Sequence, residues 1–400
     1  QAPPAPDGAA RQEPAPKQAT PKKGEDAKGG EKTAAPPADI SGLIGPILAR
    51  HDLPGMAAVV VTRKGITARG VTGVRQREFP ERLTLDDRFH LGSCLKAMTS
   101  SLTAIFVKEG KLRWDSTLAE LFPERLGGEG SIHEDYRDVT VEQLLSHHGG
   151  CPQNLMAGGL WSTLLMHQGT PREARAILVR EVIKNAPAVR PGVDYLYSNA
   201  GYAIVGHALE RIAKVPFEEL IQTQMFKPLG ITTAGFGPAW TDAEKRDQPI
   251  GHRPDGSAVT VRRFADNPLG IAPAGCGHMT LADWSRFIRW HLNGAADIQT
   301  PLLDQNAFDR LHRPEVKEHA YALGWLVGER PWAGGRVLYH DGTNTMNYCI
   351  AWLAPERGFA VMVACNQGGD SAAKAADELV SELIRYHLER NPSKEAGKGN

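Results

Sequence analysis

Strand-like segments stand at both ends of this 400-residue chain, and a long run of helix-like segments separates them. Two β-like runs at 56–62 and 67–74 follow a short amphipathic segment, and the sequence returns to strands only beyond residue 321. Because a strand must bury one face against a partner, the two ends are predicted to meet in one antiparallel sheet flanked by terminal helices. The middle then forms a second, mostly helical domain, and a ligand site is expected between the two parts. The predicted fold class is α+β.

The other elements follow from the spacing of apolar residues. Helices are expected at 40–50, 93–109, 141–147, 172–185, 199–213, 217–225, 281–292 and 371–388. Strands of the C-terminal part are expected at 322–327, 336–339, 347–352 and 359–364. The folded domain is predicted to span 40–390, with the sheet part at 40–90 and 315–390 and the helical part at 91–314.

Both ends of the chain are predicted to be disordered. Residues 1–39 contain no aromatic residue and no Val, Leu, Ile or Met, so they cannot bury enough apolar surface to offset the entropy of ordering. Residues 391–400 are polar and rich in Gly and Lys. The start at Gln1 suits the end left after removal of a signal peptide, and trimming of an expressed chain suits it equally. On the first interpretation the protein is periplasmic, secreted or at the cell surface, and residues 1–39 are a linker that tethers it near the envelope.

The composition argues against several classes of function. The 46 Lys and Arg residues balance 46 Asp and Glu residues, and no basic stripe is interleaved with aromatics, so a nucleic-acid partner is not expected. No apolar run approaches the roughly 20 residues that a membrane-spanning helix needs. The five cysteines are an odd number without C-x-x-C spacing, which indicates neither a disulfide framework nor a zinc ribbon and leaves at least one thiol free. The expected partner is a small molecule.

The first candidate for chemistry is a Ser-x-x-Lys pair, Ser93 and Lys96, at the start of an apolar helix. Three-residue spacing places both side chains on one helix face. A serine hydroxyl needs a base to become a nucleophile, and burial against apolar surface lowers the pKa of a lysine enough to serve. The helix N-terminus adds backbone N–H donors for developing negative charge. Ser371 and Lys374 match the same pattern, and an isolated match is usually a capped helix. The position of each pair relative to other motifs must therefore show which pair is the catalytic candidate.

The second candidate is Tyr197-Ser198-Asn199, in a turn that leads into a helix. A phenol beside an ammonium group loses its proton more easily and can relay protons, while an amide can anchor a substrate carbonyl. The plainer interpretation is that Tyr197 packs and that Ser198 or Asn199 caps the following helix.

The third candidate is His340-Asp341-Gly342, followed by Thr343, at the end of a predicted strand. A glycine on an edge strand lets a ligand approach the backbone, and the next N–H group can then donate to an oxyanion. Residues 147–150 also contain H-x-G triplets, but they follow a helix.

The order of the three motifs resembles the serine β-lactamase and penicillin-binding-protein superfamily. The resemblance is to the branch with class C β-lactamases, D-stereospecific peptidases and β-lactamase-like esterases. Ser371 does not fit it, because no further motif follows that serine. The resemblance covers about 40–388 and implies a β-lactamase/transpeptidase-like fold. It extends beyond the triplets to segments 89–93, 144–150, 227–231 and 274–280.

The resemblance implies a role for each motif residue. Ser93 is the expected nucleophile, Lys96 its base partner, and Tyr197 the acid or base that passes the proton to the leaving group. Asn199 is expected to orient the acyl amide or ester. The implied activity is that of a serine hydrolase with an acyl-enzyme at Ser93, acting on a small-molecule or peptide ester or amide. No cofactor is implied.

The third motif supplies the rest of the implied site and also departs from the family. The backbone N–H groups of Ser93 and Thr343 are expected to form the oxyanion hole beside Gly342. Relatives that bind β-lactams or peptidoglycan stems usually carry K-T-G, whereas His340 and Asp341 stand here. An esterase or peptidase is therefore favoured, with a β-lactamase or D-Ala-D-Ala-type peptidase as the alternative.

Two other classes of function are weighed. A non-catalytic binding module on the same fold is kept as an alternative because of the unusual His340-Asp341 pair, and labelling of Ser93 would distinguish it. Metal catalysis is disfavoured, because His147, His148, Cys151 and His278 show neither H-x-H-x-D nor H-E-x-x-H spacing. Cys94 lies about 100° around the helix from the serine and is interpreted as a packing residue.

Overall fold

The computed structural model describes residues 35–128, 130–314 and 320–392. The elements below belong to the compact unit Pro37–Asn400. Most of the predicted linker at 1–39 and of the predicted tail at 391–400 lies outside the described residues. No helix in the described ranges is long and apolar enough to cross a membrane.

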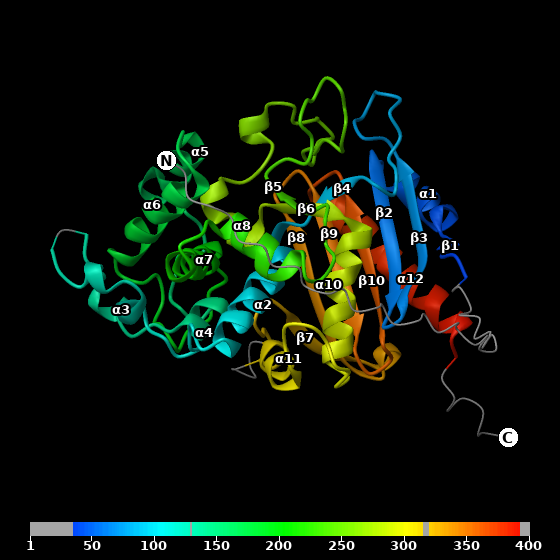
Figure 1. Ribbon diagram of the computed structural model, residues 1–400. Helices are drawn as coiled ribbons and strands as arrows, with labels where there is room; N and C mark the ends of the chain where they lie inside the picture. Colours follow the sequence, from blue (N-terminus) through cyan, green and yellow to red (C-terminus); the bar gives the residue numbers. More distant parts are fainter. Residues whose placement is uncertain (1–34, 129, 315–319, 393–400) are drawn as a thin grey trace, which may run out of the picture. The chain divides into compact units, whose positions relative to one another are not determined.

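A seven-stranded sheet joins the two ends of the folded part (Figure 1). Its strand order is β1-β3-β2-β10-β9-β8-β7, and every pairing except that of β1 with β3 is antiparallel. The expected meeting of N-terminal and C-terminal strands is confirmed by the pairing of β2 with β10. The strands are β1 Ala38–Asp39, β2 Gly55–Thr62, β3 Gly65–Gly73, β7 Leu326–Arg330, β8 Gly335–Thr343, β9 Tyr348–Ala354 and β10 Phe359–Cys365.

Helices cover both faces of this sheet. On one face, α1 (Ser41–Arg50) and α12 (Asp370–Arg390) pack with β2 and β10 in one apolar cluster. On the other face lies α10 (Leu281–Gly294), which contacts β2 and β10 (Figure 1). The central strands are covered on both sides, so both of their faces need apolar side chains. This explains their continuous runs of Ala, Val and Met. The predicted α+β class is confirmed.

The remaining helices lie mainly beside the sheet (Figure 1). Three of them, α7, α9 and α11, contact α2 (Leu95–Lys108). The α2 helix is buried continuously from Leu95 to Phe106 and so holds its N-terminus at the centre of the fold. Threonine caps begin several of these helices; Thr170 and Glu173, for example, form a capping box at the start of α6. The helices are α3 Leu118–Leu121, α4 Val141–Leu145, α5 Leu160–Met166, α6 Pro171–Ile183, α7 Asn199–Ala213, α8 Phe217–Ile221, α9 Ala272–Gly275 and α11 Gln305–His312.

Several expectations need correction. The strand expected at 322–327 begins only at Leu326, because Gly324, with φ +87°, forms a turn whose backbone packs on Ala97. The linker expected to run to Asp39 ends earlier, since Ala38 and Asp39 pair with β3. The helix expected at 217–225 becomes a π turn after α8, and α10 packs on the large sheet although it falls in the expected helical part. The α11 helix was not predicted.

A second, small sheet was also not predicted. It has the order β4-β6-β5, with β4 at Arg88–His90, β6 at Gly277–Thr280 and β5 at Gly235–Phe236. These strands are too short to show an apolar alternation. β4 leads directly into the Ser-x-x-Lys segment, so the small sheet fixes where that segment starts.

Candidate active site

The three sequence motifs meet around one cavity of about 340 Å³. One wall comes from the turn that precedes α2, a second from the segment before α7, and a third from the end of β8. The lining residues are Ser93, Tyr195, Tyr197, Tyr321, Leu326, His340, Asp341 and Thr343. Lys96 and Asn199 lie next to this cavity in contact with each other, and Gly342 packs behind Ser93.

Lys96 connects the first two motifs. Its Nζ lies 3.0 Å from Ser93 Oγ, 2.8 Å from Asn199 Oδ1 and 2.9 Å from the Ala274 carbonyl oxygen. The side chain is fully buried, and this burial lowers the pKa of Lys96 to about 7; the nearby Cys94, Cys276 and Asp341 oppose the shift. A lysine that is half neutral near pH 7 can accept a proton there.

Two glycines bring the Ser93 turn against the end of β8. Gly92 has φ +46°, and a Cβ atom on it would lie 2.3 Å from the Thr343 backbone nitrogen. A Cβ on Gly342 would lie 2.1 Å from the Leu91 carbonyl oxygen. The backbones therefore touch in a way that only glycine permits. β8 is not the edge strand that was expected, but β7 pairs only with Gly335–Tyr339, so the rest of β8 is open toward the turn.

Tyr197 differs from its expected behaviour. Lys96 Nζ lies over the Tyr197 ring, 4.8 Å from the centroid. Burial raises the pKa of Tyr197 well above its usual value, although a hydrogen bond with Ser93 acts in the opposite direction. The easier proton loss expected from the motif is therefore wrong in direction. Ser198 caps α7, because its Oγ accepts the Ala200 N–H at 3.1 Å.

His340 does not replace the positive charge of the usual lysine. Its Nδ1–H donates to the Asp341 carbonyl oxygen, so Nε2 is the acceptor for the Tyr321 hydroxyl at 3.2 Å. Burial and the charge of Lys96 lower the pKa of His340 to about 4. The imidazole is therefore neutral at physiological pH. The Asp341 side chain lines the cavity, and His340 beside it carries no positive charge that would compensate the carboxylate.

Sequence reasoning missed several residues of this site. Tyr195 could have been predicted, because it stands two positions before Tyr197 on the same extended segment. Tyr321 and Leu326 belong to no motif. His147 was examined as part of an H-x-G triplet and as a candidate metal ligand, but not as a structural support of this site. Its backbone has φ +65°, its carbonyl oxygen accepts the Leu196 N–H, and its Nδ1 accepts the Ser198 N–H at 3.1 Å.

The cysteines and the second Ser-x-x-Lys segment are structural. All five cysteines are free and buried. Cys94 Sγ donates to the His340 carbonyl oxygen and lies 3.5 Å from Cys349 Sγ, which fits the expected packing role. Ser371 Oγ donates to the His51 carbonyl oxygen near the start of α12, far along the chain from the other motifs. Within the described ranges, no group of three or more His, Cys, Asp or Glu side chains could hold a metal ion.

Comparison with known proteins agrees with this architecture. The family described as Beta-lactamase matches residues 40–384. The unguisins hydrolase ungD' of Aspergillus campestris is 25% identical over 370 residues, covering 89% of this chain. The chain spans only 66% of that hydrolase. Penicillin-binding protein 4 of Amycolatopsis lactamdurans is 28% identical over 350 residues, covering 84% of this chain and 86% of the relative.

A solved structure shows the same fold. The class C beta lactamase from Rhodobacter sphaeroides aligns with a TM-score of 0.68 at 18% identity, covering 87% of this chain and 98% of that chain. At this identity the likeness concerns the fold alone. The expected β-lactamase-like arrangement of a mostly antiparallel sheet and helices is thereby confirmed. Because the family model matches most of its length, the chain belongs to the beta-lactamase family.

Proposed function

We propose that this protein hydrolyses esters or amides through an acyl-enzyme at Ser93. The observation that carries the proposal is the set of partners around Lys96 Nζ. Asn199 Oδ1 and the Ala274 carbonyl oxygen can only accept hydrogen bonds, whereas Ser93 Oγ can also donate. A neutral amine has two protons and one lone pair. It gives its protons to the two acceptors and turns the lone pair to the Ser93 hydroxyl, which is the arrangement that a general base needs.

The reaction follows from this arrangement. Lys96 takes the Ser93 proton as Oγ forms a bond to the substrate carbonyl carbon, and the oxyanion is stabilised by the backbone N–H groups of Ser93 and Thr343. When the carbon–leaving-group bond breaks, Tyr197 gives its hydroxyl proton to the leaving group and receives one from Lys96. A neutral phenol suits this donor role, in line with the raised pKa of Tyr197. Water then releases the acyl group by the reverse sequence of proton transfers.

The charge of the cavity supports a substrate class. Asp341 lines the cavity, and the neutral His340 beside it supplies no compensating charge. A carboxylate about 4 Å from Asp341 would be disfavoured by about 1–4 kcal/mol for effective dielectric constants of 80 to 20. We therefore infer a preference for neutral or cationic esters and amides over penicillins and peptide C-termini.

We infer the cellular location of the protein from its family. Penicillin-binding proteins and β-lactamases act in the cell envelope or outside the cell, and we propose the same location here. The residues before β1 would then act as a tether, as their composition suggests. Cell fractionation with an antibody to the folded part tests this, and recovery of the protein only in the cytoplasm would contradict it.

Labelling tests the proposed activity directly. A fluorophosphonate probe should modify the wild-type protein at Ser93, identified by peptide mass spectrometry, and should leave Ser93→Ala unmodified. A panel of short p-nitrophenyl esters, D-amino-acid amides and nitrocefin then identifies the substrate class. Fastest turnover of nitrocefin would favour the β-lactamase alternative. A folded wild-type protein that no probe labels would indicate the non-catalytic binding module instead.

A further inference from the structure

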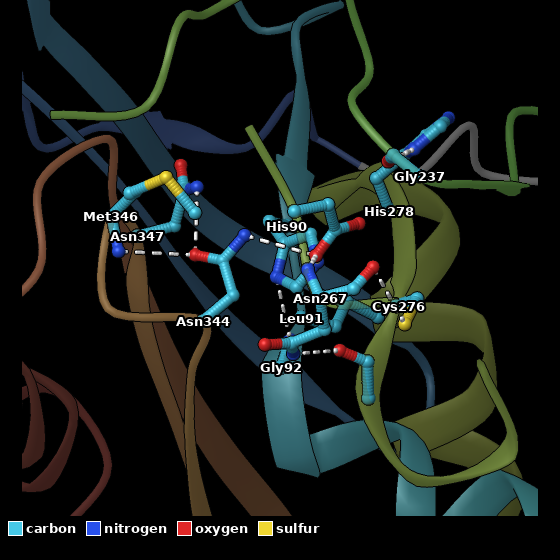
Figure 2. A network of polar contacts seen from close by, with 12 residues as sticks. His90, Leu91, Gly92, Gly237, Asn267, Cys276, His278, Asn344, Met346 and Asn347 are labelled. Atoms are coloured by element: carbon cyan, nitrogen blue, oxygen red, sulfur yellow. Dashed lines mark hydrogen bonds and ion pairs between the residues drawn. The ribbon is translucent and has the colours of Figure 1, made fainter. Parts of the chain in front are cut away.

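A buried polar network surrounds Gly92, the residue that precedes Ser93 (Figure 2). Its centre is His90, the last residue of β4, which precedes Ser93 by three positions. The His90 side chain contacts the carboxylate of Asp266, which belongs to the segment before α9. Their side chains are only 6% and 4% exposed. Neither residue lines the cavity around Ser93.

The hydrogen bonds define the state of the His90 ring. The Gly92 N–H donates to His90 Nδ1 at 3.0 Å, so Nδ1 carries a lone pair. The proton of the neutral ring is then on Nε2, which lies 2.8 Å from Asp266 Oδ1. The hydrogen bond from Gly92 therefore fixes the tautomer, and the Asp266 carboxylate is a close polar contact of the other ring nitrogen without a well-aligned hydrogen bond.

Asp266 links this ring to the opposite wall of the site. Asp266 Oδ1 accepts a hydrogen bond from Asn344 Nδ2 at 3.1 Å. Asn344 follows Thr343, whose backbone N–H is the second proposed oxyanion donor, and its Oδ1 in turn accepts the Met346 N–H (Figure 2). One carboxylate thus connects the Ser93 turn to the end of β8.

The same segment also reaches the residue that holds Lys96. Asp266 Oδ1 accepts the N–H of Asn267, whose Nδ2 donates to the Gly275 carbonyl oxygen at 3.2 Å. Gly275 follows Ala274, whose carbonyl oxygen lies 2.9 Å from Lys96 Nζ. The network therefore reaches the residue next to each proposed oxyanion donor, Ser93 and Thr343, and the residue next to Ala274, whose carbonyl oxygen holds Lys96.

We propose that His90 and Asp266 are positioning residues for acylation, which hold the Ser93 turn and the end of β8 in register. The inference rests on the proposed function of Ser93. Gly92 has φ +46°, a conformation that glycine adopts and leaves at little cost, so the hydrogen bond to His90 helps to hold the turn in place. Two oxyanion donors stabilise a transition state only when both aim at the same point, and small displacements near reacting atoms cost up to about 100-fold in rate.

His278 provides a matched control for a merely structural role. It lies on β6 directly opposite His90 in the strand register, and it is equally buried. Its Nδ1 hydrogen-bonds the Gly237 carbonyl oxygen at 2.8 Å rather than the Ser93 turn (Figure 2). Loss of either ring should cost similar stability, but only loss of His90 should change the reaction.

The experiment compares His90→Asn, His90→Gln and His278→Asn in the full chain. Asparagine can place an acceptor near the position of Nδ1 and retain the Gly92 bond, whereas glutamine reaches toward Asp266 and loses that bond. We expect His90→Gln to lower kcat for a p-nitrophenyl ester and the rate of fluorophosphonate labelling by about 10- to 100-fold, with KM changed less than about 3-fold. His90→Asn should recover most of the rate, and His278→Asn should stay within about 2-fold of wild type at a similar loss of Tm.

The outcomes separate the two proposals. Labelled wild-type protein with an unchanged rate in His90→Gln overturns the positioning role alone, as does an equal rate loss in His278→Asn. Asp266→Asn keeps the shape of the side chain but removes its charge, so its labelling rate should lie between those of the wild type and Asp266→Ala. Equal labelling rates in all three proteins would also overturn the positioning role. A wild-type protein that is not labelled overturns the proposed function and this inference together.

Discussion

Asn199 Oδ1 lies 2.8 Å from Lys96 Nζ, so the residue expected to orient a substrate also holds the base. Because an amide oxygen is uncharged, it orients the amine without stabilising the ammonium form as a carboxylate would. Burial lowers the pKa of Lys96 to about 7, and the uncharged Asn199 side chain does not oppose that shift. The neutral partner is therefore part of what makes the lysine a base.

Asn199→Asp should move the pH profile. Lys96 must be neutral to accept the Ser93 proton, so kcat/KM of the wild type should rise with pH through about 7. A carboxylate at the same distance would favour the ammonium form and shift this acidic limb upward by about one unit or more. Asn199→Ala is the control, since it removes the oxygen without adding charge and should not shift the limb upward. An unchanged limb in Asn199→Asp would contradict the role of Lys96 as base.

Ser93→Ala and Lys96→Ala should each abolish turnover while the fold persists. The two side chains act as one unit, so the double variant should lose little more than either single variant. We expect a loss of at least about 1000-fold in kcat for each, measured with a p-nitrophenyl ester, and far-UV circular dichroism like that of the wild type. Lys374→Ala is a matched control in the other Ser-x-x-Lys segment and should retain full activity.

Buried histidines should make the fold sensitive to acid. His291 Nδ1 lies 2.8 Å from His312 Nε2, and burial lowers the pKa of His291 to about 3 and that of His312 well below its usual value. Since the unfolded chain binds these protons more readily, stability is full above pH 6.5 and falls as the pH decreases toward 3. One such group costs about 2 kcal/mol of unfolding free energy between pH 7.5 and pH 5.

Urea denaturation at several pH values measures this effect. His312→Gln keeps an amide beside His291 but removes one proton-binding group, so its stability should depend less steeply on pH. His133→Gln, which replaces a histidine whose side chain is 31% exposed, is the matched control variant. Equal slopes in wild type and His312→Gln would contradict the assignment of neutral buried rings.

The parts of the fold that were predicted correctly depend on local patterns. The strand expected at 359–364 is β10, and the helix expected at 199–213 is α7, because a continuous apolar run and a 3.6-residue period are visible in any short window. The small sheet has no such pattern. His90 in β4 and His278 in β6 are polar residues that the sheet buries only because tertiary contacts satisfy them.

The residues of the candidate site also fall into two groups, those that local spacing predicts and those that only tertiary packing brings together. Ser93 and Lys96 share one helical turn, so their spacing alone places them together. Tyr321 and Asp266 come from segments without periodicity, and only the packed fold brings them to the site. Burial is also a tertiary property, which is why the direction of the pKa shift of Tyr197 could not be predicted from its motif.

Asp341→Thr should change substrate preference. Asp341 lies in the cavity wall at the middle position of the third motif, where the K-T-G pattern has a threonine. Removing the carboxylate relieves repulsion of an anionic substrate, so kcat/KM for penicillins should rise by about 5- to 1000-fold, the range that a penalty of about 1–4 kcal/mol implies. Neutral esters should change much less, and cationic esters should lose rate. Asp341→Asn is the matched control, since it keeps the shape and removes only the charge, and it should reproduce the gain for penicillins. Parallel changes for neutral and anionic substrates would show that Asp341 acts through packing, and efficient penicillin hydrolysis by the wild type would refute the electrostatic argument.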